Sequence, residues 1–203
     1  MKSVKLDGNE VFPSKIVCIG RNYVAHIQEL GNEIPAEPVI FIKPNSTIAA
    51  NIHSGEPGEI HFEGEISFLV RAGKLAAVAF GLDLTKRDLQ SRLKAKGLPW
   101  ERAKAFDGAA VFSEFVSFNG QVNDLRLELH INDQLAQQGG CELMIYKPAD
   151  IIREVQGFLT CEDGDVIMTG TPAGVGPVRA GDRFSGKIYA GKELLTAASW
   201  VVQ

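Results

Sequence analysis

The segment His61-Phe-Glu-Gly-Glu-Ile-Ser-Phe-Leu-Val70 has the alternating pattern of a β-strand. Successive side chains of a strand point to opposite faces, so Glu63 and Glu65 share one face, about 7 Å apart. The other face is apolar and suited to a core, with Ile66, Phe68 and Val70. Because two carboxylates this close repel each other, a cation between them would stabilise the strand. A Glu-x-Glu pattern alone also fits an acidic strand exposed to solvent, so other residues must decide.

The rest of the chain is divided into many short segments. Alternating apolar residues predict further strands around Leu125, Leu127 and Leu129, and from Phe184 to Tyr189. Three pairs of residues have the composition of tight turns: Asn132-Asp133, Gly191-Lys192 and Asp163-Gly164. Together with 21 glycines and 9 prolines in 203 residues, this pattern predicts an α+β fold weighted to β-strands.

The sequence favours three helices at most. The first follows a short strand at residues 15–20 and extends from Tyr23 to Leu30, with Asn22 as its N-cap and Gly31 as its stop.

The second helix extends from about Lys86 to Lys96 and ends at Gly97, with Thr85 and Asp88 as a variant of the capping box. The third begins near Pro148 and ends before Gly157. One of its faces is apolar, with Ile151, Ile152 and Val155.

The composition is that of an ordinary globular protein. Hydrophobic residues make up 45% and charged residues 23%, which is too apolar on average for a disordered chain. No repeat, low-complexity tract or linker marks a boundary, so we expect one domain over residues 1–203. Lysine and arginine number 21 against 25 acidic residues, a net charge of -4 without a basic block, so nucleic acid is not an expected partner.

No apolar run approaches the roughly 18 residues that cross a bilayer, and residues 1–12 lack a secretory apolar stretch. We therefore expect a cytoplasmic protein without a membrane partner. The three cysteines, Cys18, Cys141 and Cys161, are far apart and form no C-x-x-C pair. This spacing predicts reduced and mostly buried thiols rather than disulfides or a thiolate metal site.

A third carboxylate lies at a strand end downstream. Asp83 closes the apolar run that precedes the second helix, where functional residues are commonly presented, although it can equally serve the turn. If it joins Glu63 and Glu65, three hard oxygen ligands leave room for water and substrate. That ligand set favours Mg²⁺ or Mn²⁺ over Zn²⁺, in a catalytic rather than a structural role.

The first helix contains a second candidate pair. His26 and Glu29 are three residues apart and share a helical face. A carboxylate beside an imidazole fixes its tautomer and raises its basicity, as a water-activating base requires. An ordinary surface pair has the same spacing. Arg21 and Tyr23 lie at the helix start, where free backbone N–H groups also attract anions.

The segment Gly170-Thr-Pro-Ala-Gly-Val-Gly176 follows the apolar strand at 165–169 and looks like a phosphate-binding loop. It matches neither the P-loop nor the G-x-G-x-x-G pattern, so we expect no nucleotide site. Its glycines can nevertheless bring the backbone close to a small anion. The chain has no G-x-S-x-G elbow, which leaves a serine hydrolase without support.

Six segments resemble, in order, the fumarylacetoacetate hydrolase family, in particular its short acylpyruvase-like members. They are IGRNYVAHIQE (19–29), FIKP (41–44), HFEGE (61–65), LDLTKRDLQ (82–90), GLPWERAKAF (97–106) and MTGTPAGVG (168–176). Together they span nearly the whole chain, and several ordered motifs are far more specific than any one alone. The fold that the resemblance implies is the family's layered, mixed β-sheet roll with few short helices.

By that resemblance, Glu63, Glu65 and Asp83 correspond to the carboxylates that hold Mg²⁺ or Mn²⁺. His26 and Glu29 correspond to the water-activating pair, and Lys104 to the lysine that stabilises developing enolate charge. Four further residues would contact the substrate's carboxylate and carbonyl oxygens: Arg21, Tyr23, Gln90 and Thr171. The resemblance also implies a homodimer.

The activity implied is metal-dependent hydrolysis of a carbon–carbon bond in a 2,4-diketo acid, of acylpyruvate or fumarylpyruvate type, with release of pyruvate. The alternative is decarboxylation of oxaloacetate, or interconversion of its keto and enol forms, by the same metal–enolate chemistry. A second alternative is a non-catalytic protein that binds a metabolite. Two departures from the family's pattern concern the pocket: the stretch between Glu65 and Asp83 is shorter, and Gly64 and Ser67 replace larger or different residues.

Overall fold

The computed structural model describes residues 1–55 and 59–203. Its strands are β1 (Val4–Leu6), β2 (Asn9–Val11), β3 (Lys15–Gly20), β4 (Val39–Pro44), β5 (Ile48–Ala49), β6 (Ile60–Phe62), β7 (Gly64–Arg71), β8 (Lys74–Asp83), β9 (Thr85–Lys86), β10 (Ala110–Phe112), β11 (Val116–Ser117), β12 (Leu125–Ile131), β13 (Gln134–Gly140), β14 (Val166–Met168), β15 (Gly176–Pro177), β16 (Arg183–Ala190) and β17 (Glu193–Val201). Its helices are α1 (Val24–Glu29), α2 (Arg87–Ala95), α3 (Glu101–Lys104) and α4 (Pro148–Gln156), with 3-10 turns at Asn45–Thr47, Val122–Asp124 and Cys141–Leu143.

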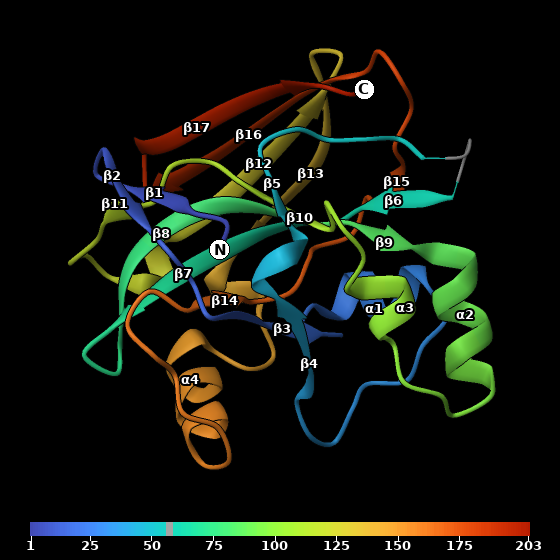
Figure 1. Ribbon diagram of the computed structural model, residues 1–203, viewed down its shortest axis with the longest axis horizontal. Helices are drawn as coiled ribbons and strands as arrows, with labels where there is room; N and C mark the ends of the chain where they lie inside the picture. Colours follow the sequence, from blue (N-terminus) through green and yellow to red (C-terminus); the bar gives the residue numbers. More distant parts are fainter. Residues whose placement is uncertain (56–58) are drawn as a thin grey trace.

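Two of the sheets form the layers of the molecule. The larger has the strand order β4-β3-β14-β7-β8-β10-β5, with β11 also paired to β8, and it mixes parallel and antiparallel pairs. The smaller is antiparallel, in the order β13-β12-β16-β17, and lies over β7 and β8 in Figure 1. Short sheets β1-β2 and β15-β6-β9 complete the strand-rich, curled fold that the sequence predicts.

The β7–β8 hairpin is the centre of the molecule because both of its faces are buried. Ile66 and Phe68 pack in the core between the two large sheets, as predicted. Val70 does not join them, since a register shift between Leu69 and Val70 turns it toward a separate cluster on α4. The predicted strand is also interrupted at Glu63, which joins β6 to β7.

The predicted turns are present, and their backbone angles explain the residue types. Asn132 and Asp133 have φ of +50° and +67° in the β12–β13 hairpin, a conformation that Asn and Asp tolerate better than other side chains. Gly191 connects β16 to β17. The shortened stretch between Glu65 and Asp83 is a plain hairpin with the two-residue turn Ala72-Gly73.

Two of the helix predictions need correction. α1 begins at Val24 with Tyr23 as its N-cap, because the side chain of Asn22 instead donates to the carbonyls of Tyr146 and Thr169. α2 begins at Arg87, and Thr85 belongs to β9, so no capping box forms.

The limit of three helices is also wrong, because α3 is a single turn at Glu101–Lys104 that has no periodic apolar pattern to reveal it. α2 ends before Gly97 and α4 spans the predicted range. Within the described ranges, no helix is long and apolar enough to span a membrane.

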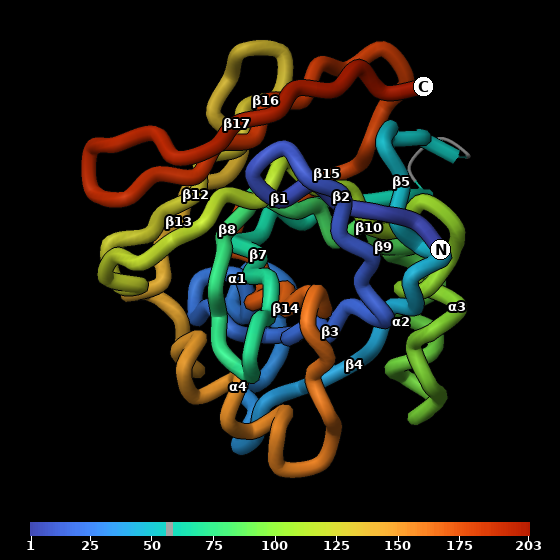
Figure 2. Tube along the Cα trace, turned by 60° about the vertical axis from the view of Figure 1, so that its left-hand side comes forward, coloured from blue at the N-terminus to red at the C-terminus, as the bar shows by residue number. Residues whose placement is uncertain are grey.

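The helices lie at two places around the sheets. Figure 1 shows α1, α2 and α3 together beside β9, whereas α4 lies below the large sheet. In Figure 2 the β1–β2 hairpin lies across β8 and β10, where Val4 and Leu6 complete a second apolar cluster. Cys18 and Cys141 are buried, Cys161 is partly buried, and all three are free thiols, as predicted.

Candidate active site

The three predicted carboxylates converge at one end of the β7–β8 hairpin. Glu65 pairs with Gly81 across the hairpin, and the backbone N–H of Asp83 donates to the carbonyl of Glu63 at 2.9 Å. One oxygen from each carboxylate lies within 4.8 Å of the other two. None of the three residues is more than 6% exposed. An acidic strand facing solvent, the alternative for Glu63 and Glu65, is therefore excluded.

Two cationic side chains hold this cluster from one side. Nζ of Lys104 donates to Glu63 Oε2 and Asp83 Oδ2, both at 2.7 Å, and to Thr85 Oγ1 at 2.6 Å. Arg87 pairs with Glu63 and donates to Gln90 Oε1 at 2.8 Å. Lys104 is the last residue of the single-turn helix α3, and from there its ammonium group reaches the carboxylates of Glu63 and Asp83.

These contacts shift the pKa values of both Lys104 and Glu63. Burial opposes the charged form of Lys104, but the carboxylates of Asp83 and Glu63 outweigh it and raise the pKa of the lysine. Burial alone would raise the pKa of Glu63, but the charges of Lys104 and Arg87 hold it well below its usual range. Glu63 is therefore ionised and Lys104 is cationic at neutral pH.

Lys43 is a site residue that the sequence reasoning missed. It is fully buried on β4, and its Nζ lies 2.9 Å from Asp83 Oδ1, an ion pair without hydrogen-bond geometry. Its donors go to the carbonyls of Leu84, at 3.3 Å, and Lys104. The sequence did contain a signal for this role, because Lys43 lies inside the apolar run Val39–Pro44. A lysine that such a run buries needs a buried partner, since unpaired lysines are almost never fully buried.

Glu65 gives the test of whether these residues fit a metal ion. Burial, then the charges of Asp83 and Glu63, raise the pKa of Glu65 well above its usual value. Within the described chain, Glu65 accepts a hydrogen bond from the backbone N–H of Gly170 at 2.7 Å. Asp83 Oδ1 also has no hydrogen-bond partner among the described residues. Among the described residues Glu65 has no cationic partner of its own, and three buried hard oxygen donors of this kind fit a divalent cation of the Mg²⁺ or Mn²⁺ type.

His26 and Glu29 make the contact that their spacing predicts. His26 Nδ1 lies 3.2 Å from Glu29 Oε2, and His26 itself is only 6% exposed. Glu29 Oε1 accepts a hydrogen bond from the backbone of Gly174 at 3.0 Å, which fixes the carboxylate that orients the imidazole. The pair is thus built into the site and is not an ordinary surface pair.

The glycine loop at 170–176 therefore holds two anions, and both belong to the protein. Gly170 donates to Glu65 and Gly174 to Glu29. Gly174 has a φ of +100°, and a Cβ atom there would lie 2.1 Å from the carbonyl oxygen of Ala136. Only glycine fits this position, since the close approach would force the backbone to move.

One cavity brings Glu63 and Glu65 together with His26 and Lys104. Its lining residues are Ile19, Gly20, Arg21, His26, Leu30, Asn32, Phe41, Glu63, Glu65, Arg87, Gln90, Lys94, Trp100, Lys104 and Thr171. The predicted residues Arg21, Gln90 and Thr171 are among them. The hydroxyl of Thr171 already donates to the carbonyl of Gly64 at 2.9 Å and accepts from Gln137 at 2.8 Å.

Tyr23, the fourth residue predicted to contact the substrate, does not line this cavity. It is 2% exposed within the main core, burial raises the pKa of its hydroxyl, and that hydroxyl has no hydrogen-bond partner among the described residues. Its ring packs in the main core and does not line the cavity, and its contact with substrate oxygens stays a prediction.

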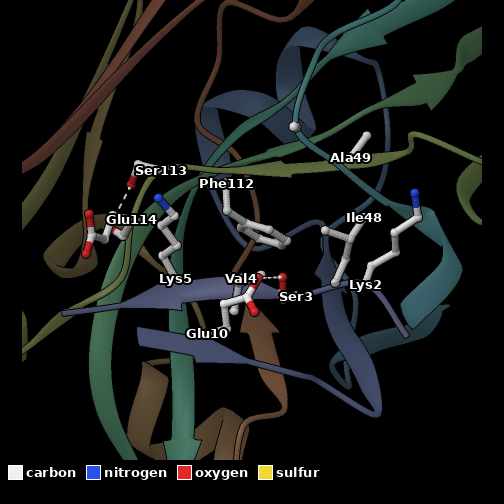
Figure 3. Close-up of a pocket in the computed structure, with 11 residues that line it drawn as sticks. Lys2, Ser3, Val4, Lys5, Glu10, Ile48, Ala49, Phe112, Ser113 and Glu114 are labelled. Atoms are coloured by element: carbon white, nitrogen blue, oxygen red, sulfur yellow. Dashed lines mark hydrogen bonds between the residues drawn. The ribbon is translucent and has the colours of Figure 1, made fainter. Parts of the chain in front are cut away.

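A larger cavity, of about 420 Å³, lies away from this chemistry. Figure 3 shows it between the N-terminal strand and β10, with Lys2, Lys5, Glu10 and Glu114 around it. Among its polar groups, the hydroxyl of Ser3 donates to Glu10 at 2.9 Å. We place the candidate site in the smaller cavity because the buried carboxylates, the imidazole and Lys104 meet there.

This fold and this arrangement of carboxylates, imidazole and lysine define an enzyme of the fumarylacetoacetate hydrolase type. Residues 15–198 match the family model described as fumarylacetoacetate (FAA) hydrolase C-terminal. The chain belongs to the fumarylacetoacetate hydrolase family.

Two relatives of similar length are named for reactions of oxaloacetate. The oxaloacetate tautomerase YcgM of Escherichia coli (strain K12) is 38% identical over 190 residues, which cover 85% of this chain and 87% of that protein. The mitochondrial oxaloacetate decarboxylase of Dictyostelium discoideum is 36% identical over 185 residues, covering 82% and 85%.

Solved structures agree on the fold. A crystal structure from Oleispira antarctica, provisionally described as a fumarylacetoacetate isomerase/hydrolase, superposes with a TM-score of 0.92 at 39% identity and covers 100% of both chains. Fumarylpyruvate hydrolase from Pseudomonas aeruginosa, solved in complex with Mn²⁺ and pyruvate, has a TM-score of 0.84 at 28% identity, covering 100% of this chain and 96% of that one.

Proposed function

We propose that this chain is an oxaloacetate tautomerase that works with Mg²⁺ or Mn²⁺ held by Glu63, Glu65 and Asp83. The observation that carries the proposal is the cavity in which Glu63 and Glu65 meet His26 and Lys104, with Asp83 completing the carboxylate cluster behind them. Relatives named for reactions of oxaloacetate are 38% and 36% identical, against 28% for the fumarylpyruvate hydrolase. The comparisons therefore favour the alternative of the sequence prediction over its main hypothesis, a 2,4-diketo acid hydrolase.

The geometry suits a proton transfer. Glu29 engages His26 at Nδ1, which leaves Nε2 to accept the proton from the carbon beside the keto group. The electron pair of that C–H bond then forms the carbon–carbon double bond, and the keto oxygen takes up the negative charge and, from the protonated imidazole or water, a proton. A bound divalent ion supplies Lewis acidity that polarises the keto oxygen.

Lys104 supports the same step electrostatically. Its ammonium group is buried and fixed by three hydrogen bonds, so it presents positive charge without reorganising as the enolate develops. Gln90 is held by Arg87 and lines the same cavity, where its amide can contact the substrate's carboxylate. These roles are proposals for each residue, and they account for the cations that surround the carboxylates.

The second candidate is the hydrolase. The same His26 would then take a proton from water, which attacks the distal carbonyl of an acylpyruvate and expels pyruvate as its enolate. This candidate is supported by the similarity to the fumarylpyruvate hydrolase of Pseudomonas aeruginosa, which was solved with Mn²⁺ and pyruvate. Decarboxylation of oxaloacetate uses the enolate stabilisation alone and needs no attacking water.

One experiment separates the three reactions. Metal-stripped protein is incubated with oxaloacetate or acetylpyruvate, with and without Mg²⁺ or Mn²⁺, while enol absorbance and pyruvate are followed. The metal alone, without protein, corrects for the solution reaction. Faster loss of enol without pyruvate supports the tautomerase, pyruvate from oxaloacetate the decarboxylase, and pyruvate from acetylpyruvate the hydrolase.

The isosteric Glu65→Gln variant tests the metal site, because it removes one ligand charge and keeps the shape of the side chain. We expect it to need more metal for the same rate. Equal rates with and without metal in the native protein would contradict the metal-dependent proposal, and silence with both substrates would contradict the keto acid class.

A further inference from the structure

Two cations face the cavity without a carboxylate of their own. Arg87 and Lys104 are paired with Glu63, but Arg21 and Lys94 have no ion pair among the described residues. Nε of Arg21 is buried and has no hydrogen-bond partner in the described chain. Cations turned into a cavity and left unpaired favour the entry of an anion.

The backbone at Arg21 is strained. Its φ is +55°, in the left-handed region that non-glycine residues occupy infrequently, and it directly follows the last residue of β3. Such conformations persist where the surrounding structure over-determines them, often at ligand contacts. The chain thus leaves the strand direction at Arg21, and the side chain of Arg21 lines the cavity.

Lys94 is held in place by a neutral partner. It lies in the last turn of α2 and donates to Asn32 Oδ1 at 2.7 Å, so its direction is fixed while its charge is uncompensated. Burial, then the charges of Arg21 and Arg87, lower the pKa of Lys94. Lys94 and Arg21 line the same cavity, and a bound carboxylate would offset the repulsion between them.

We propose that Lys94, together with Arg21, binds the second carboxylate of the substrate and selects keto dicarboxylic acids over acylpyruvates. The inference rests on the proposed function, in which the first carboxylate and keto oxygen lie beside Glu63, Glu65 and Asp83. Leu30, Phe41 and Trp100 also line the cavity, so an apolar acyl group is the competing occupant of this end.

The test compares two ligands that do not react. L-malate and L-lactate differ by one carboxylate, and their binding to Mn²⁺-loaded protein is measured by calorimetry. We expect native protein to bind malate about 10-fold or more tighter than lactate, as one partly buried charge-assisted contact would give. Lys94→Met should abolish that preference and leave lactate affinity within about 2-fold, whereas Lys94→Arg should keep it.

Lys96→Met is the matched control, since Lys96 is exposed, lies two residues away and does not line the cavity. Thermal unfolding checks that each variant is folded. Native protein that binds malate no tighter than lactate, or a Lys94→Met variant that weakens both equally or neither, overturns the proposal. Because no turnover is measured, this result is independent of whether oxaloacetate is tautomerised, so the subsite and the proposed function can fail separately.

Discussion

Nζ of Lys43 lies 2.9 Å from Oδ1 of Asp83, with both residues almost completely buried. Lys104 takes the other oxygen of the same carboxylate, and Lys43 also donates to the carbonyl of Lys104. Asp83 is thereby fixed between β4 and α3. Lys43 is a positioning residue in this arrangement, because its contacts are with the groups that form the site.

Replacing Lys43 with Met should destabilise the protein and disturb the site together. Removing Lys43 takes away one of the two buried cations that hold Asp83, and breaking a buried ion pair costs about 3 kcal/mol of the free energy of unfolding, measured by urea denaturation. Oxaloacetate turnover per folded molecule should also fall. Lys5→Met, at an exposed position on β1, is the control and should change stability by less than about 0.5 kcal/mol. Equal stability of the two variants would show that Lys43 is not needed.

Replacing His26 with Ala should remove the proton-transfer group and spare the metal ligands. We expect the metal-dependent tautomerisation rate to fall by about 10²- to 10⁴-fold, with Mn²⁺ affinity unchanged in a calorimetric titration. His53→Ala, at an exposed residue outside the cavity, should keep the native rate. Native turnover by the His26 variant would rule out the assigned base.

Replacing Gly174 with Ala should disturb the orientation of the His26 imidazole, because Gly174 holds Glu29 and Glu29 contacts His26. The added Cβ would clash with the carbonyl of Ala136, and the loop shift would withdraw the N–H that Glu29 accepts. We expect slower turnover and a changed pH profile of the rate. Gly181→Ala is the matched control, because Gly181 also has a positive φ, of +84°, but has nothing within 4 Å. Both variants carry backbone strain of at least about 1 kcal/mol, so activity loss shared by both would count against the positioning role.

Asp165 should contribute to stability only while it is ionised. Burial raises its pKa, but hydrogen bonds from Lys15, Ser14 and the backbone of Glu162 outweigh this, so the pKa lies below its ordinary 3.8. The stabilisation is therefore complete above that value and is lost as the pH falls through it toward the folded-state pKa.

The Asp165→Asn variant should accordingly be less stable at pH 7 by about 2 kcal/mol, and the difference from native protein should shrink below about pH 4. Urea denaturation at several pH values measures this. The exposed Asp107→Asn variant should show no such dependence, and a difference that stays constant with pH would contradict the role given to ionised Asp165.

The homodimer implied by the family resemblance stays a prediction. Light scattering should give twice the 22.0 kDa of the chain, independent of dilution over the micromolar range. A mass equal to one chain would contradict it.

The sequence predicted the parts of this structure that have short-range causes. The Asn132-Asp133 turn, the alternation in β12 and the His26–Glu29 contact each depend on residues a few positions apart. The convergence of Glu63, Glu65 and Asp83 needed the ordered family motifs as well, because strand periodicity alone allowed an exposed acidic face.

Predictions failed where a distant partner decided the outcome. Asn22 caps no helix, since carbonyls of Tyr146 and Thr169, more than 120 positions away, accept its amide. Lys43 and Lys94 were overlooked because only the folded chain shows which charges they face. The burial of Tyr23 could not be read from the motif that assigns it to the substrate, and that contact stays a prediction.

The Ala72-Gly73 turn gives the hairpin a second use. Glu65 and Asp83 lie at one end of β7–β8, and the turn begins seven residues after Glu65, about 23 Å along an extended strand. Peptide added between Ala72 and Gly73 would extend into solvent without entering the cavity. An epitope or a fluorescent reporter can therefore be carried there, where it would track the protein in a cell extract while leaving the chemistry at the far end of the hairpin undisturbed.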